Sequence, residues 1–293
     1  MELRQLEHFV AVVDGGGFTA AAAHLRVAQP GVSVQVRKLE REVGQPLLER
    51  TPRGVRLTAA GEAALPHARA ALAAAAAVRE HVAELSGLLR GSLRVGLLLA
   101  SAPEPFTGVL RAFRERAPGV ELTVVEADAA ALQRAVLDGS LDVAWVATGP
   151  GTPAGLTGQV LAEEEVVAVL AAGALPPRRR TTPLVDLLEH PLVCPPRGGG
   201  IRAVLEEACA AAGLVPRVAV EASSPATAVE LAAGGLGAAL VPASLAAGLD
   251  PARCGVLRVV RPALRARVQL VRRAGTPAAP AVREFWRLAR AAG

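Results

Sequence analysis

The sequence is short of the residues on which most enzyme chemistry and aromatic recognition depend. It contains no tyrosine, and aromatic residues make up 2% of its 293 residues, so a pocket built from stacked rings is not expected. Lys38 is the only lysine, which excludes the lysine-containing phosphate loop of nucleotide hydrolases. The Gly-Xaa-Ser-Xaa-Gly turn of serine hydrolases is also absent. We therefore expect no enzyme activity and no catalytic residue.

Histidine and cysteine are too few and too scattered to suggest a metal site or a disulfide framework. The five histidines follow no metal-binding spacing. The three cysteines, Cys194, Cys209 and Cys254, are odd in number and unpaired in spacing. We interpret them as reduced, buried side chains. No metal and no cofactor is expected.

Long apolar runs are missing as well. Hydrophobic residues make up 52% of the chain, but much of this is alanine, and Arg, Glu, Gly or Pro interrupts every run well before the roughly 20 residues that span a bilayer. The residues from Met1 to Gln5 lead straight into an amphipathic pattern, without a signal peptide. We expect a cytoplasmic protein with no membrane partner, long enough for two or three domains.

Positive charge is concentrated near the N-terminus. The net charge of the whole chain is +5, yet residues 26–56 hold seven Arg or Lys against three Glu. A local basic patch of this kind favours a polyanionic partner such as nucleic acid. A solvated helix face is the alternative interpretation, and charge alone does not choose between the two.

The first sixty residues predict three short helices. Apolar residues recur at helical spacing from Leu3 until Gly15–Gly17 ends the segment. The small residues of 20–25 predict a second, closely packed helix. A third begins at Gln29, with Pro30 in the first turn where proline is tolerated.

The third helix has one apolar and one polar side. Its apolar stripe is predicted to be Val32, Val36, Leu39 and Val43. The predicted polar side consists of Gln29, Ser33, Gln35, Arg37 and Lys38. A helix-turn-helix presents the start of such a helix to the major groove of DNA, and these side chains suit that task.

A short hairpin with a basic tip is predicted after the third helix. Residues 46–50 and 55–57 flank Thr51-Pro52-Arg53-Gly54. Such a wing would bring Arg50, Arg53 and Arg56 to phosphates or to the minor groove, contacts that position a protein more than they specify sequence.

The order of these features resembles the signature of the LysR-type transcriptional regulators. The matching residues are Phe18–Ala22, Val27–Pro30, Val32-Ser33, Leu39-Glu40, Gly44, Pro46-Leu47, Arg50, Arg56–Thr58 and Ala60-Gly61. The resemblance implies a sequence-specific regulator that binds double-stranded DNA. It places Gln29, Pro30, Ser33, Gln35 and Arg37 at or near the DNA and Arg50 and Arg53 in the wing. Family members often carry Gln where this chain has Val34, so the recognised sequence is expected to differ.

A long helix is predicted to follow the wing. Thr58 is a good N-cap, Glu62 falls in the first turn, and the Ala-rich pattern runs to about Leu88, with a bend expected at Pro66. Because such a helix is not stable alone, we expect it to pack against the same helix of a second subunit. Two recognition helices would then meet successive major grooves. The resemblance implies a homodimer or a homotetramer.

The C-terminal two thirds alternate between strand and helix patterns, which predicts two α/β lobes. The predicted strands are 92–99, 120–126, 141–146, 166–170, 192–194, 218–221, 238–242 and 267–271. The predicted helices are 106–117, 129–138, 201–212, 227–233 and 281–291. The last strand and helix are expected to return to the first lobe, as in the periplasmic-binding-protein-like folds that the family's effector domain resembles.

The predicted architecture is therefore an α plus α/β chain of three parts. Residues 1–58 form a winged helix-turn-helix, residues 59–90 a linker and dimerisation helix, and residues 91–293 an effector-binding domain. Lobe I of that domain comprises about 91–161 and 267–293, and lobe II about 162–266.

The cleft between the lobes is the expected site for a small-molecule effector. By resemblance, its residues are Ala100, Ser101, Thr148, Gly198, Gly199, Gly200, Ser223, Ser224 and Thr227. Gly198–Gly200 suggest either an anion-binding nest or a plain loop, and Arg197 and Arg202 suggest a carboxylate effector. RNA polymerase is expected as a further partner.

Two other functions remain open at this stage. The α/β part could be a ligand-binding protein or an enzyme for which the N-terminal helices are only an oligomerisation module. Alternatively, the chain could be an architectural DNA-binding protein whose C-terminal domain has lost its ligand.

Overall fold

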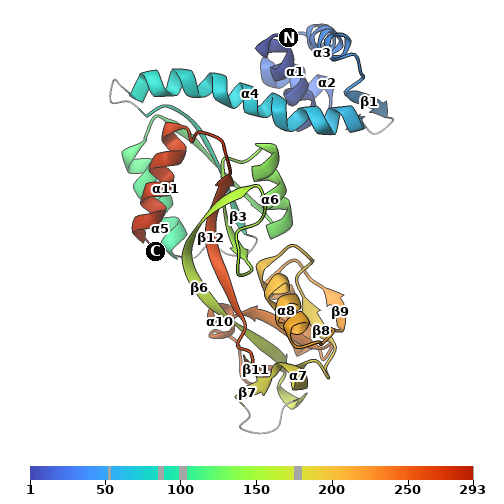
Figure 1. Cartoon of the computed structure of the whole chain (residues 1–293), viewed down its shortest axis with the longest axis vertical. Coiled ribbons are helices and arrows are strands. Elements are labelled where there is room, and N and C mark those ends of the chain that lie inside the picture. The colour runs from blue at the N-terminus through green and yellow to red at the C-terminus, as the bar shows by residue number, and fades with distance from the viewer. Residues whose placement is uncertain (52–53, 85–88, 99–103, 175–179, 293) are drawn as a thin grey trace. The chain divides into compact units, whose positions relative to one another are not determined.

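The computed structural model describes residues 1–51, 54–84, 89–98, 104–174 and 180–292. The chain divides into two compact units (Figure 1). The N-terminal unit comprises residues 1–91 and 137–140, and the C-terminal unit comprises residues 92–136 and 141–293.

The N-terminal unit contains the three short helices, the hairpin and the long helix that the sequence predicts. The helices are α1 (Leu3–Asp14), α2 (Phe18–Leu25), α3 (Gln29–Val43) and α4 (Ala59–Glu84). Between α3 and α4, the antiparallel strands β1 (Leu48–Thr51) and β2 (Gly54–Leu57) pair with Leu48 opposite Leu57. The predicted far end of the long helix, near Leu88, lies outside the described residues.

A small apolar core holds these helices together. Phe9 of α1 is fully buried and shares one cluster with Val32, Val36 and Leu39 of α3. Ala21 of α2 is also fully buried, and its short side chain lets α2 approach its neighbours closely. Three of the four residues of the predicted apolar stripe therefore face this core.

Val43 departs from the predicted stripe because it lies at the very end of α3. Its side chain is 43% exposed and lines an open hollow beside Met1 and Leu6. The helix ends at Gly44, which has a φ of 76°, and this left-handed conformation suits glycine. Val43 is therefore on the core side of α3 but beyond the packed part of the core.

Thr58 caps α4 as predicted. Its hydroxyl oxygen accepts a hydrogen bond from the backbone N–H of Gly61 at 3.0 Å and the hydroxyl donates to the carbonyl oxygen of Pro46 at 2.7 Å. Arg69, farther along α4, forms an ion pair with Asp14 of α1. Pro66 lies inside the helix.

The first lobe of the C-terminal unit is built on β3 (Gly91–Leu98), β4 (Val120–Ala127) and β5 (Val143–Thr148), in the order β4-β3-β5. The helices α5 (Glu104–Arg116) and α6 (Ala129–Asp138) connect them, and β3 runs parallel to β5. The last helix, α11 (Pro280–Ala292), lies beside α5 in Figure 1. The rings of Phe113 and Phe285 join these helices edge to face at 5.6 Å.

Two long strands run through both lobes of this unit (Figure 1). They are β6 (Leu156–Ala171) and β12 (Arg265–Arg273), which pair with each other in antiparallel register. Beyond Glu165, β6 pairs instead with β10 (Ala238–Pro242) and β11 (Cys254–Val260). The sequence predicted only the buried second half of β6 as a strand.

The second lobe extends the sheet in the order β6-β10-β8-β9. Its remaining elements are β7 (Thr181–Pro183), α7 (Leu184–Leu187), β8 (Leu192–Cys194), α8 (Gly200–Ala211), β9 (Val218–Glu221), α9 (Pro225–Ala233), α10 (Ala243–Ala246) and a 3₁₀ turn (Ala172–Ala174). Alternate residues of β6 enter different cores, with Ala168 on one face and Val167 and Val169 on the other. The sheet is therefore buried on both faces.

The predicted state of the cysteines is confirmed, since all three are free and buried. None of the helices in the described part of the chain is long and apolar enough to cross a membrane. Among the same residues, no group of His, Cys, Asp and Glu has the geometry of a metal site.

A substitution at Gly61 can test the close packing of the N-terminal unit. A Cβ at this position would lie 2.0 Å from the carbonyl oxygen of Leu47. We expect Gly61→Ala to destabilise the protein by about 1–3 kcal/mol, because backbone must shift to admit the methyl group. Thermal unfolding followed by circular dichroism measures the effect.

Gly31→Ala is the matched control, because a Cβ built at Gly31 in α3 would meet no atom within 4 Å apart from its chain neighbours and the backbone of its own helix. Alanine in an open helical site should stabilise by about 0.5–1 kcal/mol. Equal effects of the two substitutions would contradict the packing described here.

Candidate nucleic-acid interface and effector pocket

The outward side of α3 differs in part from the predicted polar side. Arg37 and Lys38 are exposed and Gln35 is half-buried, in agreement with the sequence pattern. Ser33 is only 6% exposed, so the expectation that it faces solvent is wrong. It follows Val32 by one residue, about 100° around the helix, and therefore lies at the edge of the side that packs on the core.

An exposed stripe runs the length of α3 opposite its buried side. It consists of Pro30, Val34, Arg37, Lys38 and Arg41, which are spaced as residues on one helical face. The Nε of Arg37 donates a hydrogen bond to the carbonyl oxygen of Ser33 at 3.2 Å, which holds its side chain along the helix. The stripe carries three cations and two apolar side chains, Pro30 and Val34, and it is the surface of α3 most suited to meet a polyanion.

The wing is a two-stranded hairpin, as the sequence predicts. Arg56 of β2 is exposed and forms an ion pair with Glu49 of β1 at 3.3 Å, so part of its charge is neutralised. Arg53 lies outside the described residues, and Arg50 is described only as a backbone position in β1. The backbone therefore supports a wing, and the predicted roles of its arginines stay predictions.

A pocket of about 70 Å³ lies within the C-terminal unit, between the two lobes. At about 10–15 Å³ for each water centre, this is room for several water molecules or one small ligand. The lining is mostly apolar. The pocket is lined by Leu98, Asp128, Ala129, Ala130, Ala147, Glu164, Val166, Pro195, Pro196, Arg197, Gly199, Gly200, Ile201, Ser223, Pro225, Pro242, Ala266 and Val268.

The start of α8 is pressed against the end of β5 at the pocket. A Cβ on Gly200 would lie 2.5 Å from the backbone nitrogen of Thr148 and 2.6 Å from the carbonyl carbon of Ala147. Gly199 is the N-cap of α8 and has no such contact, and Gly198 has a φ of 93°. The three glycines therefore form a shaped turn, and Gly200 allows the closest approach between helix and strand.

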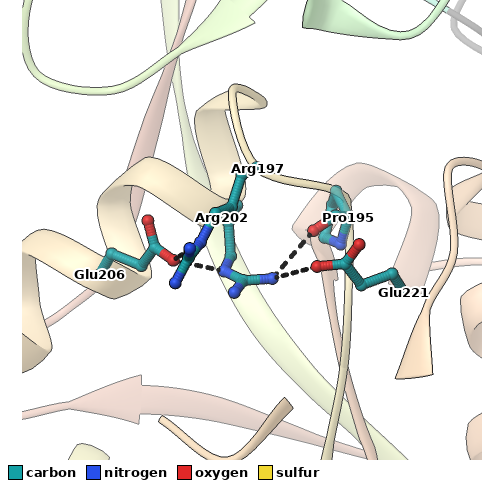
Figure 2. A network of polar contacts seen from close by, with 5 residues as sticks. All are labelled: Pro195, Arg197, Arg202, Glu206 and Glu221. Carbon is teal, nitrogen blue, oxygen red and sulfur yellow. Dashed lines mark hydrogen bonds and ion pairs between the residues drawn. The ribbon is translucent and has the colours of Figure 1, made fainter. Parts of the chain in front are cut away.

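Arg202 does not project into the pocket but ties α8 to its neighbours. Figure 2 shows its side chain between Glu206 of α8 on one side and Glu221 and the carbonyl oxygen of Pro195 on the other. The guanidinium is 6% exposed and forms ion pairs with Glu206 at 2.9 Å and Glu221 at 3.2 Å. Because two carboxylates already neutralise it, Arg202 is a poor candidate for binding an anionic effector.

Arg197 does line the pocket, yet its charge is also paired. Its Nε donates to Glu206 at 3.0 Å. Burial acts to raise the pKa of Glu206, but the hydrogen bonds from Arg197 and Arg202 outweigh it and lower that pKa below its usual value. Glu206 is therefore ionised at neutral pH and partners both arginines.

The structure brings some of the predicted effector residues to the pocket and leaves others out. Gly199, Gly200 and Ser223 line it. Ser224 is instead the N-cap of α9, and Thr227 is exposed on that helix. The remaining predicted residues fall into two groups. Gly198 and Thr148 adjoin the lining without belonging to it, while Ala100 and Ser101 lie outside the described residues.

Thr148 belongs to a buried polar cluster behind the pocket wall. Its hydroxyl group is hydrogen-bonded to Nε2 of Gln269 at 2.5 Å, and Oε1 of Gln269 accepts from Thr152 at 3.0 Å. Gln269 is 1% exposed and lies on β12, where the register with β6 shifts. The cluster joins the end of β5 to one of the two strands that run through both lobes.

Two carboxylates that line the pocket, Asp128 and Glu164, were not identified from the sequence. Oδ1 of Asp128 accepts the N–H of Ala131 at 2.8 Å in the first turn of α6. Oε1 of Glu164 accepts the N–H of Ser244 at 3.0 Å in α10. Asp128 could have been found, because it lies in the two-residue connection between the strand predicted at 120–126 and the helix predicted at 129–138. No comparable signal marks Glu164.

Both parts of the chain match family models. Residues 3–62 match the bacterial regulatory helix-turn-helix protein model of the lysR family, and residues 86–293 match the LysR substrate binding domain. The chain belongs to the LysR family of DNA-binding transcriptional regulators. This agrees with the resemblance seen in the sequence, and the family is one of regulators and not of enzymes.

Curated LysR relatives are 35–38% identical to the chain over the aligned residues. The transcriptional regulator ShiR of Corynebacterium glutamicum is 35% identical over 79% of this chain and 79% of its own length. A probable hydrogen peroxide-inducible genes activator of Mycobacterium leprae is 35% identical over 77% of this chain and 72% of its own. The match to BudR of Raoultella terrigena, at 38% identity, spans 58% of this chain and 59% of that protein.

Solved structures of LysR regulators share the fold along the whole chain. A full-length OxyR variant from Pseudomonas aeruginosa has a TM-score of 0.77 at 26% identity and covers 99% of this chain and 95% of its own. CbnR in complex with its target DNA has a TM-score of 0.63 at 28% identity and covers 100% of both chains.

A substitution at Gly200 can test the close contact between α8 and β5 at the pocket of this LysR regulator. We expect Gly200→Ala to push α8 away from β5 and to destabilise the C-terminal unit by about 1–3 kcal/mol. Urea unfolding measures the loss, which should appear as a lower midpoint at an unchanged slope.

Gly199→Ala is the neighbouring control, since the nearest atom to its Cβ is 3.5 Å away. This substitution should leave the midpoint within about 0.5 kcal/mol of the parent protein. If Gly199→Ala were the more damaging of the two, the close approach of α8 to β5 would not be the constraint.

Proposed function

We propose that this regulator binds duplex DNA with the exposed stripe of α3 in the major groove and with the wing on the sugar–phosphate backbone. The observation that carries the proposal is the cationic outward side of α3 in a segment that matches the family's helix-turn-helix model. Gln29, Pro30, Gln35 and Arg37 then lie at base edges or phosphates, and Arg50 and Arg53 contact the backbone. Ser33, which is 6% exposed, is not among the proposed contacts.

The proposed active form is a homodimer or a pair of dimers. Val78 and Val82 of α4 are 66% and 62% exposed, although valine is among the residues most often buried in folded proteins. The α4 helix of a second copy is the proposed cover, and it would place two recognition helices on successive major grooves. RNA polymerase is the proposed partner through which bound protein alters transcription.

The pocket of the C-terminal unit is the proposed effector site. Its described charged residues, Asp128, Glu164 and Arg197, are each already hydrogen-bonded within the protein. A mostly apolar lining with two carboxylates disfavours a carboxylate effector. We therefore propose a small, largely apolar molecule without negative charge as the effector, and no resident cofactor.

Peroxide sensing through a reactive cysteine is not favoured, although some relatives are named as peroxide-inducible activators. Reactive cysteines are accessible and have a lowered pKa. Here burial raises the pKa of Cys194 to about 12. Burial also raises the pKa of Cys209 and Cys254.

The thiols of the folded protein should therefore react slowly. We expect Ellman's reagent at pH 7.5 to titrate the three cysteines promptly only after unfolding in guanidinium chloride, because few thiolates form at buried sites. Hydrogen peroxide should leave the DNA affinity unchanged within two-fold. A fast-reacting thiol in the native protein would reverse this conclusion.

Binding to the DNA upstream of its own gene tests the proposed function. We expect gel-shift affinity to exceed that for random duplex and to fall steeply with salt, with a log–log slope of about −0.9 for each phosphate contact. Arg53→Ala should weaken binding to all duplexes and make the slope shallower, because it removes a phosphate contact.

Two further variants separate the proposed roles. Gln35→Ala should change the preference among sequences more than the affinity for random duplex. Arg217→Ala removes an exposed arginine of the C-terminal unit and should change neither. Equal affinity for upstream and random DNA would refute sequence-specific regulation from that region.

A further inference from the structure

Val34 is an apolar side chain that is partly exposed on the outward side of α3. It is 40% exposed and lies on the stripe of α3 between Pro30 and the cations Arg37 and Lys38. The core-facing residues Val32 and Val36 each lie two positions away, about 200° around the helix. The valine therefore does not serve the core of its own unit.

The position of Val34 makes it a fixed feature of this surface. A β-branched side chain in a helix is held in essentially one χ1 rotamer, so its two methyl groups always project from the same place. The surrounding cations would draw phosphates to either side of it. A duplex seated on the stripe would then meet a rigid apolar contact at the middle of the surface.

The major groove offers one apolar feature that matches such a contact, the 5-methyl group of thymine. Cytosine at the same place lacks this methyl group and presents an amino donor. A valine against that donor would remove its water without replacing the hydrogen bond, which is unfavourable. The same side chain therefore favours thymine and disfavours cytosine.

We propose that Val34 determines specificity by packing against the 5-methyl group of one thymine in each half-site. The proposal rests on the proposed function, since it requires α3 to lie in the major groove. It goes further by assigning a base and an atom to one residue.

Single replacements of thymine by deoxyuridine test the proposal, because deoxyuridine lacks only the methyl group. The full-length protein is first footprinted on the DNA upstream of its gene. Each thymine in the protected region is then replaced in turn, and affinity is measured by gel shift. We expect one thymine in each half-site at which the replacement weakens binding about four-fold, the equivalent of burying roughly one methyl group.

Val34→Ala assigns that effect to the side chain. The variant should bind thymine-containing DNA several-fold more weakly and should no longer distinguish thymine from uracil at that position. Val43→Ala is the matched control, because Val43 is a valine of the same helix that is 43% exposed but lies off the stripe. It should keep the full thymine preference, and circular dichroism should show both variants folded.

Different outcomes would overturn the role of Val34 and the proposed function. Specific binding without any uracil-sensitive position would overturn the role of Val34 alone. A uracil effect that persists in Val34→Ala would do the same. Absence of sequence-specific binding by the parent protein would instead overturn the proposed function, and with it this inference.

Discussion

The orientation of α3 about its own axis determines which of its side chains form the exposed stripe. Val32, Val36 and Leu39 are buried in one cluster with Phe9, and a helix anchored at three such points cannot turn without exposing them. At roughly 25 cal/mol per Å² of apolar surface, that exposure would cost several kcal/mol. The same burial therefore determines that Pro30, Val34, Arg37, Lys38 and Arg41 point outward.

The C-terminal unit depends on a different constraint, the two strands that pass through both of its lobes. Glu163 and Glu165 of β6 are paired with Arg267 and Arg258 across the sheet, each at 2.9 Å. Exposed pairs of this kind add little stability, but Gln269 beside them is buried and hydrogen-bonded to Thr148 and Thr152. A buried amide must keep its partners, so the end of β5 is held to β12 where the pocket wall begins.

Sequence reasoning succeeded where one local pattern determines one element. The bounds of β8, β9 and β10 agree with prediction, because each is a short apolar or alternating run between turn residues. Sequence reasoning was less successful where the residues that contact one another are distant in sequence. Glu163 and Glu165 precede the strand predicted at 166–170, yet both belong to β6, where they pair with Arg267 and Arg258 on other strands.

Single side chains of the site were harder to predict than elements. The exposure of Ser33 was misjudged because it is polar but sits at the edge of the buried side of α3. Asp128 and Glu164 were missed because the pocket gathers residues from many elements, and no spacing along the chain reveals that convergence. The four-residue helices α7 and α10 were also missed, being too short to show a helical period.

Arg202 and its ion pairs with Glu206 and Glu221 affect both the charge available to the pocket and the pKa of Cys194. Arg202 acts to lower the pKa of Cys194, but burial dominates and leaves that pKa at about 12. Glu206 and Glu221, which act to raise it, are the carboxylates that neutralise Arg202. Burial therefore keeps the thiol protonated, and the pairing with the two carboxylates prevents Arg202 from serving a ligand. In the proposed effector site, the groups left to select a ligand are then the apolar lining, the carboxylates Asp128 and Glu164, and the backbone at the start of α8, where Gly200 brings helix and strand together.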